Sequence, residues 1–172
     1  MKRKLLWAIA LLIPVVVAGC LVSGTKVFVI ELEGFGSIPS QMQSFHVNLS
    51  DLNSDYNDNK DKLKSIDAVT LVGDVINSGS AAANMNIYLS DNQYSTPSEV
   101  EQNATLIFES PNIPVGDTLQ LHWADGMSYM RNFDVLFQQV KDDGEFYLYG
   151  IPENSTSISY NLEIAITVTA GL

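Results

Sequence analysis

The residues best suited to chemistry in this sequence are oxygen-bearing side chains clustered between positions 51 and 61. Carboxylate and amide groups at alternate positions supply the hard oxygen ligands that Ca²⁺ prefers, and a calcium-binding loop opens with this spacing. The later positions do not match an EF-hand, because Tyr56 stands where glycine is required and Lys62 stands where a bidentate Glu is required. An irregular calcium loop remains as one interpretation, with the candidate ligands Asp51, Asn53, Asp55, Asn57 and Asp61.

A second interpretation of the same segment needs no metal. Asp51 then caps a short helix, and Leu52, Tyr56 and Leu63 face the core. We favour this interpretation, so no cofactor is expected, and calcium is kept as the alternative.

The two histidines, His46 and His122, are the other candidates for chemistry. His122 lies close to Asp125 and could act as a general base. However, alternation along residues 118–123 places His122 on the face opposite Trp123, which makes it a surface residue of a strand. The nucleophile, zinc-protease and phosphate-loop motifs do not occur in the sequence. We therefore expect that this protein is not an enzyme.

Aromatic residues gather late in the chain and offer a further kind of site. Tyr and Trp present rigid amphipathic faces that line grooves for sugar or peptide, although such residues more often form the core and rim of a sandwich. The residues concerned are Trp123, Tyr129, Phe146, Tyr147 and Tyr149.

The first twenty residues have the pattern of a targeting signal. Residues 2–4 are basic, and an apolar run of 15 residues from Leu5 to Gly19 follows them. A membrane-spanning helix needs about 20 residues, so this run is short for an anchor and suits a signal peptide. The run leads into Val17-Ala18-Gly19-Cys20, which resembles the lipobox of bacterial lipoproteins.

This resemblance implies that Cys20 is lipidated on sulfur and that the bond between Gly19 and Cys20 is cleaved. The new amino terminus is then acylated, and several chains make the attachment durable because each buried methylene contributes about 0.8 kcal/mol. The resemblance also implies a location outside the cytoplasm. Because Leu21 rather than Asp follows the cysteine, it implies the outer membrane in a cell with two membranes, facing the periplasm or the surface. In a cell with one membrane, it implies the outer leaflet of the plasma membrane.

The charge of the remaining chain restricts its partners. Three of the nine basic residues precede Cys20 and all 20 acidic residues follow it, so six basic residues leave a net charge of −14. This charge disfavours nucleic acid, which requires Lys and Arg against its phosphates, and it disfavours anionic lipid headgroups. A single cysteine also excludes a disulfide framework and a Cys-rich zinc site.

Hydrophobic alternation predicts that most of the chain forms strands. The clearest run covers residues 158–168, and the others are expected at 26–33, 45–49, 66–76, 83–90, 106–108, 118–123 and 145–151. Turns or loops are expected at 34–40, 77–80 and 96–98. Met130, Phe133, Phe137 and Val140 fall at helical spacing, which predicts one short amphipathic helix over residues 127–140.

About eight short strands separated by turns predict a mostly-β fold, an antiparallel β-sandwich. It resembles the immunoglobulin-like sandwiches of secreted bacterial proteins, without the Cys…Trp…Cys pattern of antibody domains. The expected organisation is a lipoprotein signal peptide at 1–19, a lipidated cysteine and short tether at 20–25, and a single sandwich domain at 26–172.

The expected function is that of a membrane-anchored, non-enzymatic lipoprotein. Its domain would bind or support a partner protein or an envelope component, docking through an open strand edge. One alternative is a calcium-stabilised adhesive or ligand-capture module, and another is an enzyme without recognisable local motifs.

Overall fold

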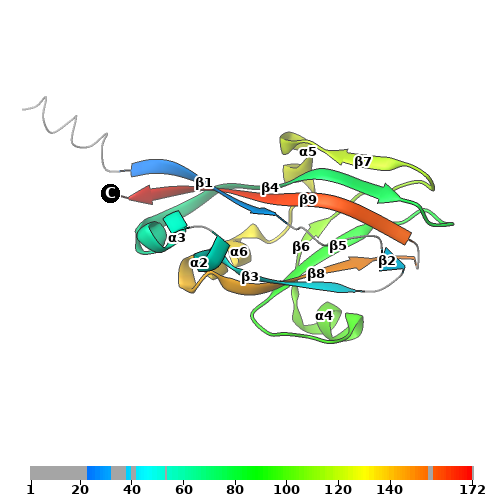
Figure 1. The fold of residues 1–172 in the computed structure, drawn as a ribbon, viewed down its shortest axis with the longest axis horizontal. Coiled ribbons are helices and arrows are strands. Elements are labelled where there is room, and N and C mark those ends of the chain that lie inside the picture. The colour runs from blue at the N-terminus through cyan, green and yellow to red at the C-terminus, as the bar shows by residue number, and fades with distance from the viewer. Residues whose placement is uncertain (1–22, 32–37, 40–41, 53, 155–156, 172) are drawn as a thin grey trace, which may run out of the picture.

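The computed structural model describes residues 23–31, 38–39, 42–52, 54–154 and 157–171, which form two antiparallel sheets (Figure 1). In the first sheet, named sheet 1, the strand order is β1-β9-β4-β7, and the short β2 also pairs with β9. In sheet 2 the order is β3-β8-β5-β6. The strands are β1 (Ser23–Glu31), β2 (Ile38–Pro39), β3 (Gln43–Asn48), β4 (Leu63–Asn77), β5 (Met85–Ser90), β6 (Thr105–Glu109), β7 (Thr118–Leu121), β8 (Glu145–Pro152) and β9 (Ser157–Gly171).

The main strands pair in a nested order, in which the first described strand pairs with the last. β1 pairs with β9, β3 with β8, β4 with β7, and β5 with β6. Ladders from β4 to β9 and from β5 to β8 join these pairs into the two sheets. The predicted mostly-β, antiparallel architecture is confirmed. The immunoglobulin type is not confirmed, since its sheets have the strand orders ABED and CFG.

The inner faces of both sheets supply one main hydrophobic core. The alternation predicted for residues 158–168 is confirmed, because the side chains expected to point inward on β9 are buried or packed against the core. These are Ile158, Tyr160, Leu162, Ile164, Ile166 and Val168. Sheet 2 contributes Val47, Leu89, Phe108 and Phe146 from the opposite side. Burying each of the large apolar side chains stabilises the fold by about 1.5–3 kcal/mol.

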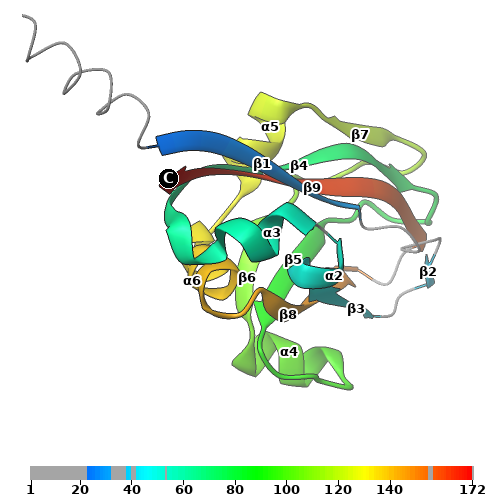
Figure 2. The ribbon, with the colours of Figure 1, turned by 60° about the vertical axis from the view of Figure 1, so that its left-hand side comes forward.

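Helices connect and cover the sheets. They are α2 (Leu49–Leu52), α3 (Ser54–Asn59), the 3₁₀ helix η1 (Lys60–Lys62), α4 (Pro97–Asn103), α5 (Trp123–Tyr129) and α6 (Phe133–Asp142). The views of Figures 1 and 2 agree that α5 lies on the sheet 1 side and that α4 lies on the sheet 2 side.

The prediction of one helix over residues 127–140 is wrong, because the chain breaks between α5 and α6. At the break, Met130 forms an isolated bridge with Phe108, and Asn132 has a left-handed φ of 44°. The break changes the rotational phase of α6 relative to the expected apolar stripe. Phe133 is therefore 54% exposed, whereas Leu136 is buried.

The loop predicted at residues 96–98 is in fact the start of α4. Thr96 accepts a hydrogen bond from the backbone N–H of Glu99, and the Glu99 carboxylate accepts one from the backbone N–H of Thr96. Pro97 fills the first turn, where its missing N–H costs nothing. The helix covers the outer face of sheet 2, where Val100 packs against Tyr149.

The contact of α5 with sheet 1 is close enough to require glycine. A Cβ atom at Gly126 would lie 2.0 Å from the backbone oxygen of Leu71 and 2.4 Å from Thr70 Oγ1. The Thr70 hydroxyl donates a hydrogen bond of 2.9 Å to the backbone oxygen of Trp123. The start and middle of α5 are thus held to the outer face of β4.

A buried amide fixes the loops that follow β4. Asn77 is fully buried, and its Nδ2 donates to the backbone oxygens of Ala81 and Ile113, each at 2.9 Å. Its Oδ1 accepts from the backbone N–H of Gly79 at 3.0 Å. All three of these bonds hold segments outside the regular strands, so this side chain determines the shape of that end of the sandwich.

Candidate functional site

The predicted lipidation and cleavage residues, Cys20 and Gly19, lie outside the described residues. The first described strand, β1, begins at Ser23, only three residues after Cys20. Among the residues that the structure describes, no helix has the length and apolar character needed to cross a membrane.

The segment proposed for calcium is helical where it is described. Tyr56 and Leu63 are buried, as the helix interpretation expects, but Leu52 is 50% exposed. Asn48, rather than Asp51, caps this segment, because its Oδ1 accepts from the backbone N–H of Ser50 at 3.0 Å.

The five candidate calcium ligands are only partly described. Asn53 lies outside the described residues, and so does the side chain of Asp55. The amide oxygen of Asn57 accepts from the Ser50 hydroxyl at 2.9 Å, and Asp51 and Asp61 are exposed. Calcium binding therefore stays a prediction, and a melting temperature that rises with calcium relative to EDTA would support it.

Neither histidine lies in an enclosed site. His122 is exposed, as predicted, but it directly precedes α5, and Trp123 is 43% exposed instead of facing the core. His46 Nε2 lies 3.0 Å from Glu145 Oε1, and both side chains are about half exposed. Water competes for both partners at this surface, so the pair contributes little to stability.

A row of polar and aromatic side chains crosses sheet 2 on its outer face. His46 of β3 stands opposite Tyr147 of β8, which stands opposite Ser90 of β5. The rings of His46 and Tyr147 are 4.7 Å apart, and Tyr147 stacks on Tyr149 at 6.4 Å. The row therefore forms a partly exposed shelf that leads across three strands to the end of β5.

The predicted aromatic groove residues are not gathered at one place. Phe146 and Tyr149 are fully buried, and Tyr129 packs edge-on against Phe108. Trp123 lies on α5, on the sheet 1 side, so only Tyr147 belongs to the shelf.

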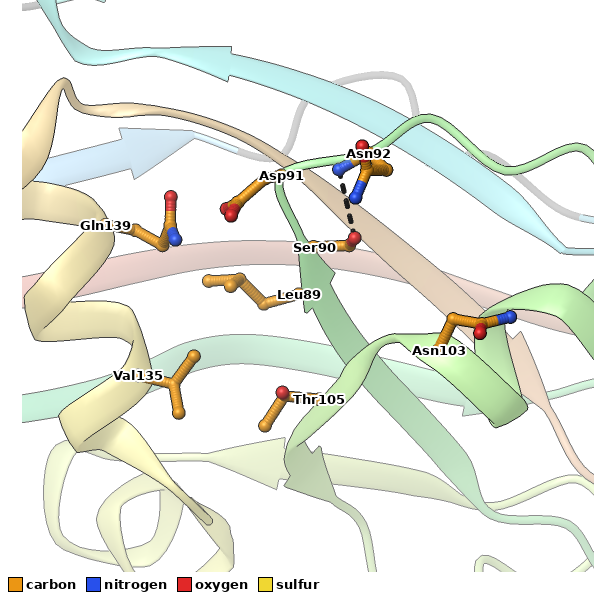
Figure 3. A pocket seen from close by; sticks show the side chains of 8 residues that line it. All are labelled: Leu89, Ser90, Asp91, Asn92, Asn103, Thr105, Val135 and Gln139. Atoms are coloured by element: carbon orange, nitrogen blue, oxygen red, sulfur yellow. Dashed lines mark hydrogen bonds between the residues drawn. The ribbon is translucent and has the colours of Figure 1, made fainter.

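A polar pocket opens where the row reaches the end of β5 (Figure 3). Its volume is about 160 Å³, and three chain segments line it: the end of β5, the junction of α4 with β6, and α6. In Figure 3, Val135 and Gln139 project from α6 towards the end of β5. The lining residues are Leu89, Ser90, Asp91, Asn92, Asn103, Thr105, Val135 and Gln139.

Local hydrogen bonds set the shape of this pocket. Ser90 Oγ accepts from the backbone N–H of Asn92 at 3.0 Å, and the Tyr149 hydroxyl donates to the Asn92 carbonyl at 2.9 Å. Asn103 Nδ2 donates to the Glu99 carbonyl at 2.8 Å, which fixes the end of α4. Burial raises the pKa of Tyr149, so this hydroxyl keeps its proton and its donor role at neutral pH.

The pocket presents hydrogen-bonding groups of both kinds. Asp91 offers carboxylate oxygens, Gln139 offers an amide donor and acceptor, and Thr105 offers a hydroxyl. Leu89 and Val135 add apolar surface. Such a site can hold a small, uncharged ligand that is itself both donor and acceptor.

Sequence reasoning missed this pocket because its residues come from segments that are far apart in the chain. The T-x-x-E capping signature at Thr96–Glu99 was a usable signal for the helix that ends at Asn103. No local spacing in the sequence relates Asp91 to Gln139, since the packing of α6 beside β5 brings them together.

Comparisons with known proteins give distant structural neighbours. No protein-family model matches this chain, and no characterised protein matches its sequence. A structure of turnip yellow mosaic virus aligns with 88% of this chain and 82% of its own, at 11% identity and a TM-score of 0.42. A structure of tobacco necrosis virus aligns with 87% of this chain and 97% of its own, at 11% identity and a TM-score of 0.38. A carbohydrate-binding module of glycoside hydrolase family 9 from Ruminococcus flavefaciens FD-1 aligns with 83% of this chain and 97% of its own, at 10% identity and a TM-score of 0.34. These scores are too low to carry an argument about this chain.

Proposed function

We propose that this protein is a lipid-anchored, non-enzymatic binding protein outside the cytoplasm, and that it captures an uncharged, hydroxyl-rich envelope component such as a neutral glycan. The observation that carries the proposal is the polar pocket between β5, α4 and α6, with its carboxylate, amide and hydroxyl lining. Sugar hydroxyls act as donor and acceptor at once, and they match such a set of groups.

The size and charge of the site narrow the ligand. Pockets for drug-sized molecules measure about 300–1,000 Å³, so a pocket of about 160 Å³ accepts a single ring of a longer chain. The Asp91 carboxylate and the net charge of −14 after Cys20 repel anionic sugars. The shelf formed by His46 and Tyr147 extends from the pocket and offers an aromatic face to a neighbouring sugar unit.

The anchoring part of the proposal rests on the lipobox and on the position of β1. Lipid on Cys20 would hold the domain at the membrane, because β1 begins three residues later. Purified full-length protein and a Cys20→Ala variant would be compared by intact mass and by membrane fractionation. Loss of both the added lipid mass and the membrane association in Cys20→Ala is expected, and an unmodified Cys20 in the parent protein would refute the anchor.

The finer class of the sandwich is also a proposal. Nested pairing of β1 with β9, β3 with β8, β4 with β7 and β5 with β6 describes a long antiparallel hairpin wound into two sheets. This arrangement is a jelly roll, in place of the immunoglobulin-like class that the sequence suggested. It leaves β3 and β6 at the two edges of sheet 2, with the pocket beside β6.

Binding would be tested by saturation-transfer NMR with a panel of neutral oligosaccharides, in a detergent without a sugar headgroup. Gln139→Ala and Asp91→Ala each remove pocket hydrogen bonds, and a loss of about 1.4 kcal/mol lowers affinity about tenfold. Asn161→Ala, on the exposed face of β9, is the matched control and leaves affinity unchanged. The glycan proposal fails if no oligosaccharide binds at millimolar concentration, or if the pocket variants bind as well as the control.

A further inference from the structure

The outer face of sheet 1 carries exposed apolar side chains on β1 and on α5. Val27 and Val29 of β1 are 54% and 46% exposed, and Trp123 and Met127 of α5 are 43% and 42% exposed. Figures 1 and 2 place β1 and α5 on the same side of the sandwich, away from α4 and sheet 2.

Two cross-strand pairs and one hydrogen bond connect these two groups across the sheet. Val29 stands opposite Ala165 in β9, and Ala165 stands opposite Thr70 in β4. Thr70 in turn bonds to the backbone of Trp123. Both Ala165 and Thr70 are buried although they point to the outer face. The valines of β1 and the exposed residues of α5 therefore lie on the same outer face. Val27, Val29, Trp123 and Met127 together are named the sheet 1 patch.

Charge is distributed unevenly along this face. The cross-strand rows that contain Val27 and Val29 are completed by Thr167, Ala68, Ala165 and Thr70, all of which are uncharged. Asp67 lies at the border, where it accepts a bond of 2.7 Å from the Thr169 hydroxyl.

Further along the same strands the face becomes acidic. In the next cross-strand pair on this face, Glu163 of β9 stands opposite Val72 of β4. In the pair after that, Asp74 of β4 stands opposite Asn161 of β9. On α5, helical geometry puts Asp125 on the flank of Gly126 opposite to Trp123 and Met127. The uncharged rows thus lie between Asp67 and Glu163, and they contain Val27 and Val29 in the middle of β1.

The tether holds the beginning of β1, next to these uncharged rows, at the membrane. Three residues span at most about 11 Å, so a lipid on Cys20 holds Ser23 at the headgroup region. A domain with a net charge of −14 needs an uncharged surface to lie against a bilayer. Trp is well suited to this position because its indole combines an apolar body with a polar N–H.

We propose that the sheet 1 patch lies on the membrane interface, with Val27, Val29, Trp123 and Met127 in contact with the lipid. This inference rests on the proposed anchoring of Cys20. The pocket is lined by residues of β5, β6, α4 and α6 and of the loops beside them, and it shares no residue with the sheet 1 patch.

The fluorescence of Trp123 tests this orientation directly. The sequence has one other tryptophan, Trp7, and a Trp7→Phe background leaves Trp123 as the single reporter whether or not the signal is removed. Lipidated full-length protein would be reconstituted into phosphatidylcholine vesicles with and without brominated acyl chains. A blue shift on reconstitution and a loss of emission in the brominated vesicles are expected.

Variants separate the patch from general effects of the membrane. A Val27→Asp/Val29→Asp protein should lose most of the quenching while it remains lipidated and keeps its melting temperature, because both side chains point outward. Val115→Asp changes a valine of equal exposure outside sheet 1 and should leave the quenching unchanged.

Each remaining outcome has a defined meaning. Absence of quenching in a protein whose mass shows lipid on Cys20 overturns the membrane-facing patch and leaves the proposed anchor intact. An unmodified Cys20 overturns the anchor and this inference together. Crosslinking of the patch to a second protein, with Trp123 shielded from brominated lipid, also overturns the inference and identifies the patch as a protein interface.

Discussion

Replacing Tyr56 with Phe would measure how firmly the helical segment between β3 and β4 is held to the core. Tyr56 is fully buried, its hydroxyl donates to the Val140 carbonyl at 2.9 Å, and its ring packs edge-on against Phe28 at 6.1 Å. The substitution removes the hydrogen bond and keeps the ring. Because a buried carbonyl loses its partner, the free energy of unfolding at pH 7 should fall by about 1–2 kcal/mol.

The effect of this substitution should depend on pH. Burial, and secondarily the carboxylates of Asp143, Asp142 and Asp61, raises the pKa of Tyr56 from 10 to about 12. The folded protein holds the phenol proton more tightly than the unfolded chain. Its stabilising contribution is therefore complete below pH 10 and is lost as the pH rises through 10 to 12.

The size of this loss follows from the shift in pKa. A shift of two units corresponds to about 2.7 kcal/mol, and about 1.4 kcal/mol of it is lost at pH 11, where the unfolded tyrosine is ionised. Phe has no proton to lose. The stability difference between the wild type and Tyr56→Phe should therefore narrow by about 1.4 kcal/mol between pH 9 and pH 11.

Urea denaturation followed by circular dichroism at pH 7, 9, 10 and 11 would give these differences. Thr70→Val is a matched control, since it removes a buried hydroxyl that donates to a backbone oxygen but does not titrate. The difference in unfolding free energy between Thr70→Val and the wild type should stay constant with pH. A Tyr56→Phe difference that stays constant or widens at pH 11 would refute the reasoning from burial.

Three further substitutions test the packing described above. Gly126→Ala places a Cβ 2.0 Å from the Leu71 oxygen and should lower stability by about 1–3 kcal/mol or more, with a changed Trp emission in thermal melts as α5 moves. Asn77→Ala removes three hydrogen bonds and should cost about 2–4 kcal/mol in urea denaturation, against a near-zero change for the exposed Asn161→Ala. Thr96→Ala removes the cap of α4 and should cost about 1 kcal/mol, with faster hydrogen exchange confined to that helix. Stability equal to the wild type in any of the three would show that the corresponding contact does not hold its element in place.

The strands were predictable because apolar and polar residues alternate along the sequence of a half-buried strand. Ile158 to Val168 alternate on β9 as expected, and β3 alternates as well. On β5 and at the end of β8 both faces are buried, because α4 covers the outer face of sheet 2. Residue Leu49 shows the limit of the rule, since it is buried on the expected face but already belongs to α2. Alternation reports which side chains are buried, and it does not report where the backbone leaves the sheet.

Features that depend on contacts between distant segments were not predictable. The break at Met130 follows from its bridge to Phe108, and the exposure of Trp123 follows from the close approach of α5 to β4. The strand order and the pocket have the same origin. Each of these features arises where distant segments meet, and no segment alone carries a sequence motif for it. The spacing of residues within one segment therefore could not predict it.

The pairing of β1 with β9 has a consequence for how the protein is made. β1 is the first described strand, and its partner along its whole length, from Ser23 to Glu31, is the last. Translation adds about 5–20 residues per second, so β9 is synthesised on the order of 10 s after β1. Contacts of such high sequence separation also form slowly. Sheet 1 thus lacks the partner of β1 throughout synthesis, and it closes only after β9 has been made.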